Sequence, residues 1–157
     1  MHTLFENAYS AHPALAITAE AVLPALGFMT LLLPAIAWRT GRMKNPLLLW
    51  AWGLVSIALL YTLREVNLKT GESVAVMGLH FSSHTAVAIS FAMTLVAFRF
   101  LLLPVLLPVV AGYLWLIVYL HYHVPGDVFL TAAVMVPLSA LCHLPWWKRA
   151  RAGSCDC

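Results

Sequence analysis

Five long stretches of apolar residues, separated by short polar segments, dominate the pattern of the chain. They cover residues 14–38, 46–63, 83–98, 101–120 and 127–147. A helix needs about 20 apolar residues to cross the hydrocarbon core of a bilayer, so all but the third stretch are long enough. We expect the third to extend backward through 73–79 or to lie partly recessed. The pattern therefore predicts an all-α, polytopic transmembrane helical bundle of about five spans.

The composition supports a membrane location. Hydrophobic residues make up 62% of the chain and charged residues 10%, whereas charged residues form about a quarter of a typical soluble domain. Lipid must therefore cover much of the surface. The net charge of +3 does not indicate a nucleic-acid partner, because the basic residues sit in short clusters beside the apolar stretches. The bilayer is the expected partner, and a homo-oligomer or a membrane protein partner stays open.

The distribution of Lys and Arg predicts the orientation. Seven of the nine basic residues fall on one side of the predicted spans, and only Arg64 and Lys69 fall on the other. Cytoplasmic loops are the ones enriched in Lys and Arg, so the N-terminus is expected outside and the C-terminus inside a cell (inner) membrane. This divides the chain into a short extracytoplasmic segment (1–13), the bundle (14–147) and a cytoplasmic basic tail (148–157). Cys155 and Cys157 fall in this tail, and three cysteines in all give no disulfide framework.

Histidines gather on the outer side of this predicted topology, in two segments. Residues 80–86 lead into the third span, and residues 121–128 join the fourth span to the fifth. The four histidines in these segments are His80, His84, His121 and His123. The charge count did not require them to share one face of the membrane, so we regard this face as the candidate site.

The second segment pairs a histidine with an acid across a turn. Pro125 and Gly126 form a turn signal, and Asp127 then stands at the start of the fifth helix, four residues after His123. At this spacing a carboxylate can hold the imidazole in one tautomer, which makes it a competent nucleophile or base. His84 lies at the same depth, where it could give a proton to a leaving group.

The two segments together resemble the type 2 phosphatidic acid phosphatase superfamily, over less than half of the chain. The motifs that carry the resemblance are Ser82-x-His84-Thr85-Ala86 and His123-x-Pro125-x-Asp127-Val128.

The resemblance implies a lipid phosphatase that works without metal or another cofactor. His123 would attack phosphorus and form a phosphohistidine, Asp127 would orient it, and His84 would protonate the leaving oxygen and later activate water. Ser82 and the backbone N–H groups around Ser83 would bind phosphate oxygens, since helix N-termini favour anions. The implied substrate is a phosphorylated or diphosphorylated lipid, with polyprenyl diphosphate, phosphatidic acid and phosphatidylglycerol phosphate as candidates.

The chain departs from the family pattern mainly where phosphate is bound. Leu116 and Ile117 stand where the family carries serine and arginine, and Gly71-Glu72 replaces an Arg-Pro pair. Phosphoryl transfer depends on positioned cations. We therefore expect Arg64 and Lys69, the two outer cations, to take part in substrate binding.

Two other interpretations remain open. In one, the histidines at 80, 84, 121 and 123 converge on a metal in a membrane metal or redox protein, because imidazole binds zinc, copper, iron and nickel. Alternatively, the chain is a non-catalytic membrane scaffold or lipid-binding member of the same fold. Glu20, an acid inside the first span, is costly in lipid and is expected to face the bundle or a polar cavity, or to cap a kink at Pro24.

Overall fold

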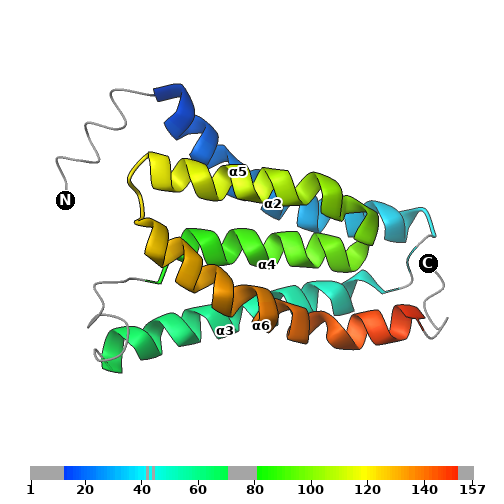
Figure 1. The fold of residues 1–157 in the computed structure, drawn as a ribbon. Helices are drawn as coiled ribbons and strands as arrows, with labels where there is room; N and C mark the ends of the chain where they lie inside the picture. Colours follow the sequence, from blue (N-terminus) through cyan, green and yellow to red (C-terminus); the bar gives the residue numbers. More distant parts are fainter. Residues whose placement is uncertain (1–12, 42, 44, 71–80, 152–157) are drawn as a thin grey trace.

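Every element that the structure describes is helical (Figure 1). The structure, a computed structural model, describes residues 13–41, 43, 45–70 and 81–151. The elements are α2 (Pro13–Arg39), α3 (Pro46–Thr70), α4 (Ser83–Phe98), the short 3₁₀ helix η2 (Phe100–Leu102), α5 (Leu103–Tyr119) and α6 (Pro125–Arg151). Each predicted apolar stretch corresponds to one helix, although α3 and α6 continue beyond their predicted ends. The predicted all-α class is confirmed.

Three helical segments are long and apolar enough to cross a membrane: Pro13–Arg39, Phe100–Tyr119 and Pro125–Lys148. Pro46–Leu59 in α3 and the whole of α4 are shorter apolar helices. Many large apolar side chains point away from the bundle, among them Phe28, Leu54, Phe100, Trp115 and Phe129. Exposure of so much apolar surface to water would be strongly unfavourable, whereas its contact with the hydrocarbon interior of a bilayer is not. The chain is therefore a helical membrane protein.

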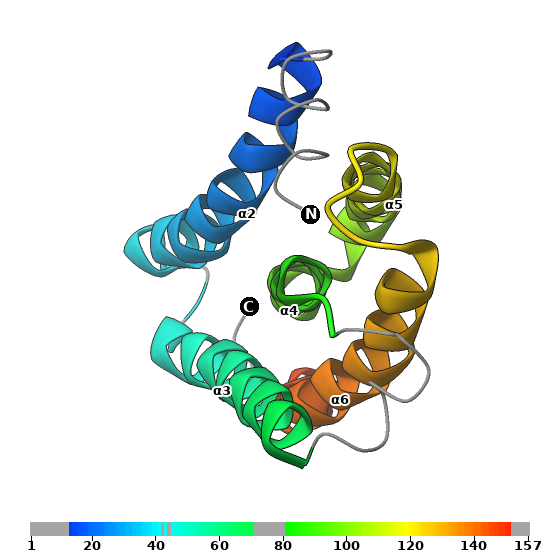
Figure 2. The same ribbon diagram turned by 90° about the vertical axis from the view of Figure 1, so that its left-hand side faces the viewer.

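Helix α4 lies in the middle of the bundle and packs against α2, α3, α5 and α6 (Figure 2). Small residues allow this, because they let neighbouring helices approach closely on every side. The buried residues of α4 are Thr85, Ala86, Ala88, Ile89, Ser90, Ala92, Thr94, Leu95, Val96 and Ala97. At 1.5 Å per residue α4 is about 24 Å long, less than the ~30 Å hydrocarbon core. The enclosing helices explain how so short an apolar helix is accommodated.

Buried polar side chains connect α4 to its neighbours. The hydroxyl of Ser56 on α3 lies 3.2 Å from that of Ser90 on α4 and 2.9 Å from that of Ser139 on α6. Nδ1 of His143, also on α6, donates to the Ser139 carbonyl at 2.7 Å, and its Nε2 lies 3.2 Å from the hydroxyl of Thr94. All five side chains are buried. Between helices such hydrogen bonds contribute on the order of 1 kcal/mol each, and they also fix the register of α3, α4 and α6.

Two glycines offer a matched test of this packing. A Cβ on Gly53 of α3 would lie 3.0 Å from Oγ1 of Thr94, whereas a Cβ on Gly112 of α5 would meet no atom within 4 Å. We expect Gly53→Ala to separate α3 from α4 and lower the free energy of unfolding by about 1–3 kcal/mol. Gly112→Ala should leave it unchanged or raise it by up to about 1 kcal/mol, because alanine favours helix. Equilibrium unfolding in mixed SDS–maltoside micelles measures both, and equal effects would contradict close packing at Gly53.

Candidate active site

The C-terminal end of α5 sets the path of the chain into the site. The N–H of Tyr122 donates to the Ile117 carbonyl and the N–H of His121 donates to the Val118 carbonyl, both at 3.0 Å. His121 has a φ of 57°. These two bonds around a left-handed residue form a Schellman motif, which ends the helix and reverses the chain. As a result Tyr122 packs back against the core near Ile117, and His123 lies just before the start of α6.

The first turn of α6 positions the carboxylate behind His123. Pro125 is the first residue of the helix, a position that suits its fixed φ, and Asp127 lies in the first turn. Asp127 is buried, with 3% of its surface exposed, and a carboxylate is stabilised at a helix N-terminus. Its Oδ2 lies 3.4 Å from Nδ1 of His123. Because Nδ1 faces the acid, Nε2 is the ring nitrogen left to act on a ligand.

The start of α4 is held by Ser82. Its hydroxyl accepts from the N–H of Thr85 at 3.3 Å and from the hydroxyl of Thr85 at 3.0 Å, which is N-cap geometry. The N–H of Ser82 donates to Oγ1 of Thr131 on α6 at 2.9 Å. Both side chains at this cap are buried. The cap explains why α4 begins at Ser83. The expected backward extension through 73–79 lies outside the described residues. For Ser82 and Ser83 the phosphate-binding role stays a prediction, since the Ser82 hydroxyl already caps the helix.

The two histidines of the predicted motifs lie side by side. The ring centroids of His84 and His123 are 6.0 Å apart, with 58° between the ring planes. The ring of Tyr122 lies 6.4 Å from that of His84. His84 is exposed at the start of α4, and 19% of the side chain of His123 is exposed. The structure thus brings the two imidazoles to one accessible location, with Asp127 behind one of them.

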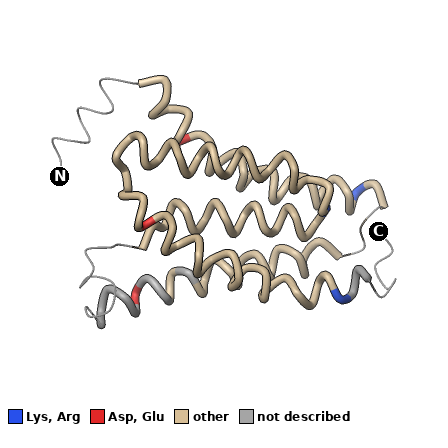
Figure 3. The backbone as a smooth tube through the Cα atoms, viewed as in Figure 1, with Lys and Arg blue, Asp and Glu red and all other residues tan. Residues whose placement is uncertain are grey.

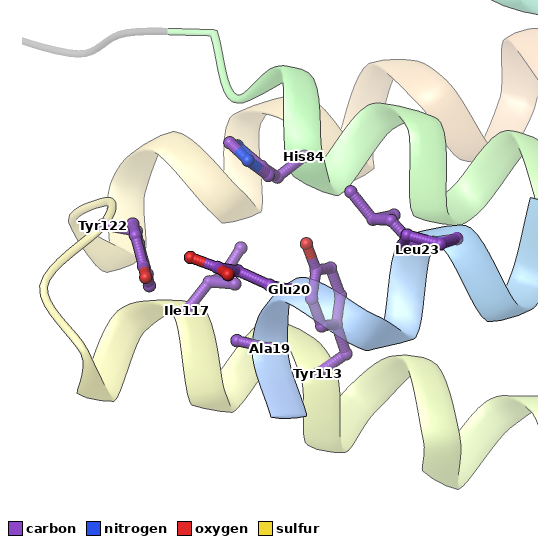
Figure 4. A pocket seen from close by; sticks show the side chains of 8 residues that line it. Ala19, Glu20, Leu23, His84, Tyr113, Ile117 and Tyr122 are labelled. Atoms are coloured by element: carbon purple, nitrogen blue, oxygen red, sulfur yellow. The ribbon is translucent and has the colours of Figure 1, made fainter. Parts of the chain in front are cut away.

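A cavity of about 350 Å³ lies beside this pair, between α2, α4 and α5 (Figure 4). Its lining residues are Ala19, Glu20, Leu23, Pro24, His84, Tyr113, Ile117 and Tyr122. The carboxylate of Glu20 and the hydroxyl of Tyr113 point into it. A polar cavity was one of the alternatives that the sequence analysis left open for Glu20, whereas it did not single out Tyr113 or Tyr122. Tyr113 is one helical turn before Ile117, so their shared helix face was the available signal.

Of the remaining candidate residues, only His121 has a side chain that the structure describes. Arg64 and Lys69 belong to the last turns of α3, but their side chains lie outside the described part of the chain, as does His80 altogether. His121 is exposed in the turn. Within the described ranges, no three His, Cys, Asp or Glu side chains gather in a way that could hold a metal ion.

The described charges are separated along the bundle (Figure 3). The acidic residues lie toward the end that carries the histidine pair, and the basic residues lie toward the opposite end. Among the described residues that line the cavity there is no Lys or Arg. The site as described is therefore acidic and aromatic next to two imidazoles.

The chain matches no protein-family model, no curated protein and no solved structure. The fold and the site define its class as a helical membrane protein with a histidine pair and a neighbouring carboxylate at one end of the bundle. Any narrower assignment rests on this geometry.

The left-handed backbone at His121 gives a prediction that separates a turn role from a metal role. Glycine adopts this conformation without the steric cost of about 1 kcal/mol that other residues bear. We expect His121→Gly to be as stable as the parent or up to about 1 kcal/mol more stable, and His121→Val to be at least about 1 kcal/mol less stable. Thermal unfolding in maltoside with EDTA measures both. A large loss for His121→Gly would show that the imidazole itself makes an essential contact.

Proposed function

We propose that this protein is an integral membrane lipid phosphatase that hydrolyses a phosphomonoester or diphosphate of a lipid through a phosphohistidine. The observation that carries the proposal is the placement of His84 and His123, whose rings are 6.0 Å apart with Asp127 at 3.4 Å behind His123. Nucleophile, orienting acid and proton donor are three of the groups that such a reaction needs from the protein, besides positive charge at the phosphate.

The proposed reaction has two steps. Nε2 of His123 attacks phosphorus, the bond from phosphorus to the lipid oxygen breaks, and the leaving oxygen takes a proton from His84. His84, now neutral, removes a proton from water. The resulting hydroxide attacks phosphorus, the N–P bond breaks, and inorganic phosphate leaves. Asp127 stabilises the positive charge that develops on His123 in the first step, because its carboxylate faces Nδ1.

We further propose five spans, with the N-terminus outside, the C-terminus cytoplasmic and the histidine pair facing the periplasm or outside of a cell (inner) membrane. The bias of Lys and Arg toward one set of loops supports this orientation. The separation of described charges along the bundle agrees with it.

One observation favours a second candidate function, a non-catalytic lipid-binding member of the same fold. Ile117 is buried, with 2% of its surface exposed, and forms part of the cavity wall where the resemblance implies a phosphate-binding arginine. In the catalytic proposal Arg64 and Lys69 supply the missing positive charge. The lipid-binding candidate needs no such positive charge, because it has no phosphoryl transfer to stabilise.

Release of inorganic phosphate distinguishes the lipid phosphatase from the lipid-binding candidate. With hexadecyl phosphate in maltoside and EDTA, we expect the parent protein to release phosphate and His123→Ala to release none. His84→Ala should lose on the order of 10²-fold or more, as is usual when a general acid–base is removed. Asp127→Asn should lose a comparable factor, because the neutral amide no longer stabilises the charged ring.

His121→Gly is the matched control, since it removes a histidine from the same turn but not from the pair. It should retain turnover. Release that survives His123→Ala would contradict the nucleophile assignment, and a folded parent with no release from any lipid phosphate would favour the lipid-binding candidate. Turnover that EDTA abolishes and zinc restores would instead favour a metal site.

A further inference from the structure

The cavity beside the histidine pair has the wrong charge for a second anionic group. Its polar lining consists of Glu20, Tyr113, Tyr122 and His84, and the described lining holds no Lys or Arg. A carboxylate within a membrane helix is unfavourable unless a partner compensates it. Among the described residues, none forms an ion pair or a hydrogen bond with the Glu20 carboxylate. Within the described part of the chain, the cavity therefore presents an exposed carboxylate without a partner to whatever enters it.

A second observation points to a ligand. The side chain of Tyr113 is 98% buried, its hydroxyl points into the cavity, and this hydroxyl has no hydrogen-bond partner among the described residues. Buried hydroxyls in proteins nearly always have a partner, because leaving one unpaired is unfavourable. Its oxygen can accept a hydrogen bond from an ammonium group. The rings of Tyr113 and Tyr122 also offer electron-rich faces, which attract cations.

We infer that this cavity is an ammonium subsite, so that the substrate is an amphiphile with an ammonium group a few bonds from its phosphate. This rests on the proposed function, which places the phosphate at the histidine pair. His84 connects the two locations, because it lines the cavity and its ring lies 6.0 Å from that of His123. A phosphate between the rings would put an ammonium two or three bonds away within reach of Glu20 and Tyr113. Two sources carry this chemistry: a zwitterionic phosphodiester headgroup and an amine-bearing phosphomonoester.

Three probes with the same tail test the subsite. They are hexadecylphosphocholine, 2-aminohexadecyl phosphate and hexadecyl phosphate. Dissociation constants are measured in maltoside on the full chain carrying His123→Ala, so that binding does not depend on turnover. We expect both ammonium probes to bind about tenfold or more tightly than hexadecyl phosphate. Adding Glu20→Gln should weaken the ammonium probes about tenfold and leave hexadecyl phosphate unchanged or tighter. Adding Tyr113→Phe should weaken 2-aminohexadecyl phosphate about threefold and change hexadecylphosphocholine little, because a quaternary ammonium group has no N–H to donate to the hydroxyl.

The chain offers a matched control for each variant. Glu65→Gln removes an exposed carboxylate on α3, and Tyr119→Phe removes the hydroxyl of an exposed tyrosine on α5. Neither residue lines the cavity, so neither change should alter the ratio of the dissociation constant of hexadecyl phosphate to that of each ammonium probe. Hexadecyl phosphate that binds as tightly as the ammonium probes would overturn the inference. So would a Glu20→Gln protein that behaves like Glu65→Gln.

Turnover by the protein with His123 intact distinguishes the sources and tests the proposed function separately. Phosphate release from 2-aminohexadecyl phosphate supports the amine-bearing monoester and the proposed function. Cleavage of hexadecylphosphocholine to phosphocholine supports the zwitterionic diester and would overturn the assignment to monoesters and diphosphates. An ammonium preference without turnover of any probe would leave the subsite standing and overturn the phosphatase. Turnover without an ammonium preference would support the phosphatase and overturn the subsite.

Discussion

The whole arrangement depends on the close packing of α4 inside a ring of other helices. Its alanines and hydroxyl residues remove the bulk that would hold neighbours apart, and in lipid buried polar groups are unfavourable unless they have a partner. Near the site, the N–H of Ser82 donates to Thr131 of α6. Toward the other end Nε1 of Trp146, also on α6, donates to the Ala97 carbonyl at 2.9 Å. With α4 tied to α6 near both ends, the start of α4, which carries His84, cannot easily slide past the start of α6, which follows the turn that carries His123.

This rigid packing keeps the rings of His84 and His123 in a fixed relative position. A nucleophile and a proton donor accelerate a reaction only when they are held near their reacting positions. Here the Schellman turn after α5, the first turn of α6 and the cap of α4 each fix one of the participating groups. The charge of the neighbouring cavity then bears on which headgroups are accepted. An arginine at position 117 would lie in the same cavity as Glu20, and its charge would be offset by that acid. In the inferred ammonium subsite, isoleucine at position 117 therefore leaves the charge of Glu20 available to the ligand.

Much of the fold could be predicted from the sequence, because hydrocarbon imposes a length and a polarity that are visible residue by residue. The bounds of the third stretch, 83–98, match those of α4, although hydropathy cannot show that the Ser82 hydroxyl caps the helix at Ser83. The proximity of His84 and His123 was expected from the resemblance and the predicted topology, but the distance between their rings depends on packing that no local pattern encodes. Tyr113 escaped notice because a tyrosine in an apolar helix looks like a core residue until its hydroxyl is found without a partner. The roles of Arg64 and Lys69 stay predictions.

The most direct test of the central claim is the identity of the covalent intermediate. In His84→Ala the second step should be slow, while p-nitrophenyl [³²P]phosphate, whose leaving group needs no protonation, can still transfer its phosphoryl group. Rapid quenching in alkaline SDS followed by peptide mapping should then find close to one phosphate per chain, stable to base, labile to acid and located on His123. A folded protein that carries no label, or carries it on any other residue, would contradict the account.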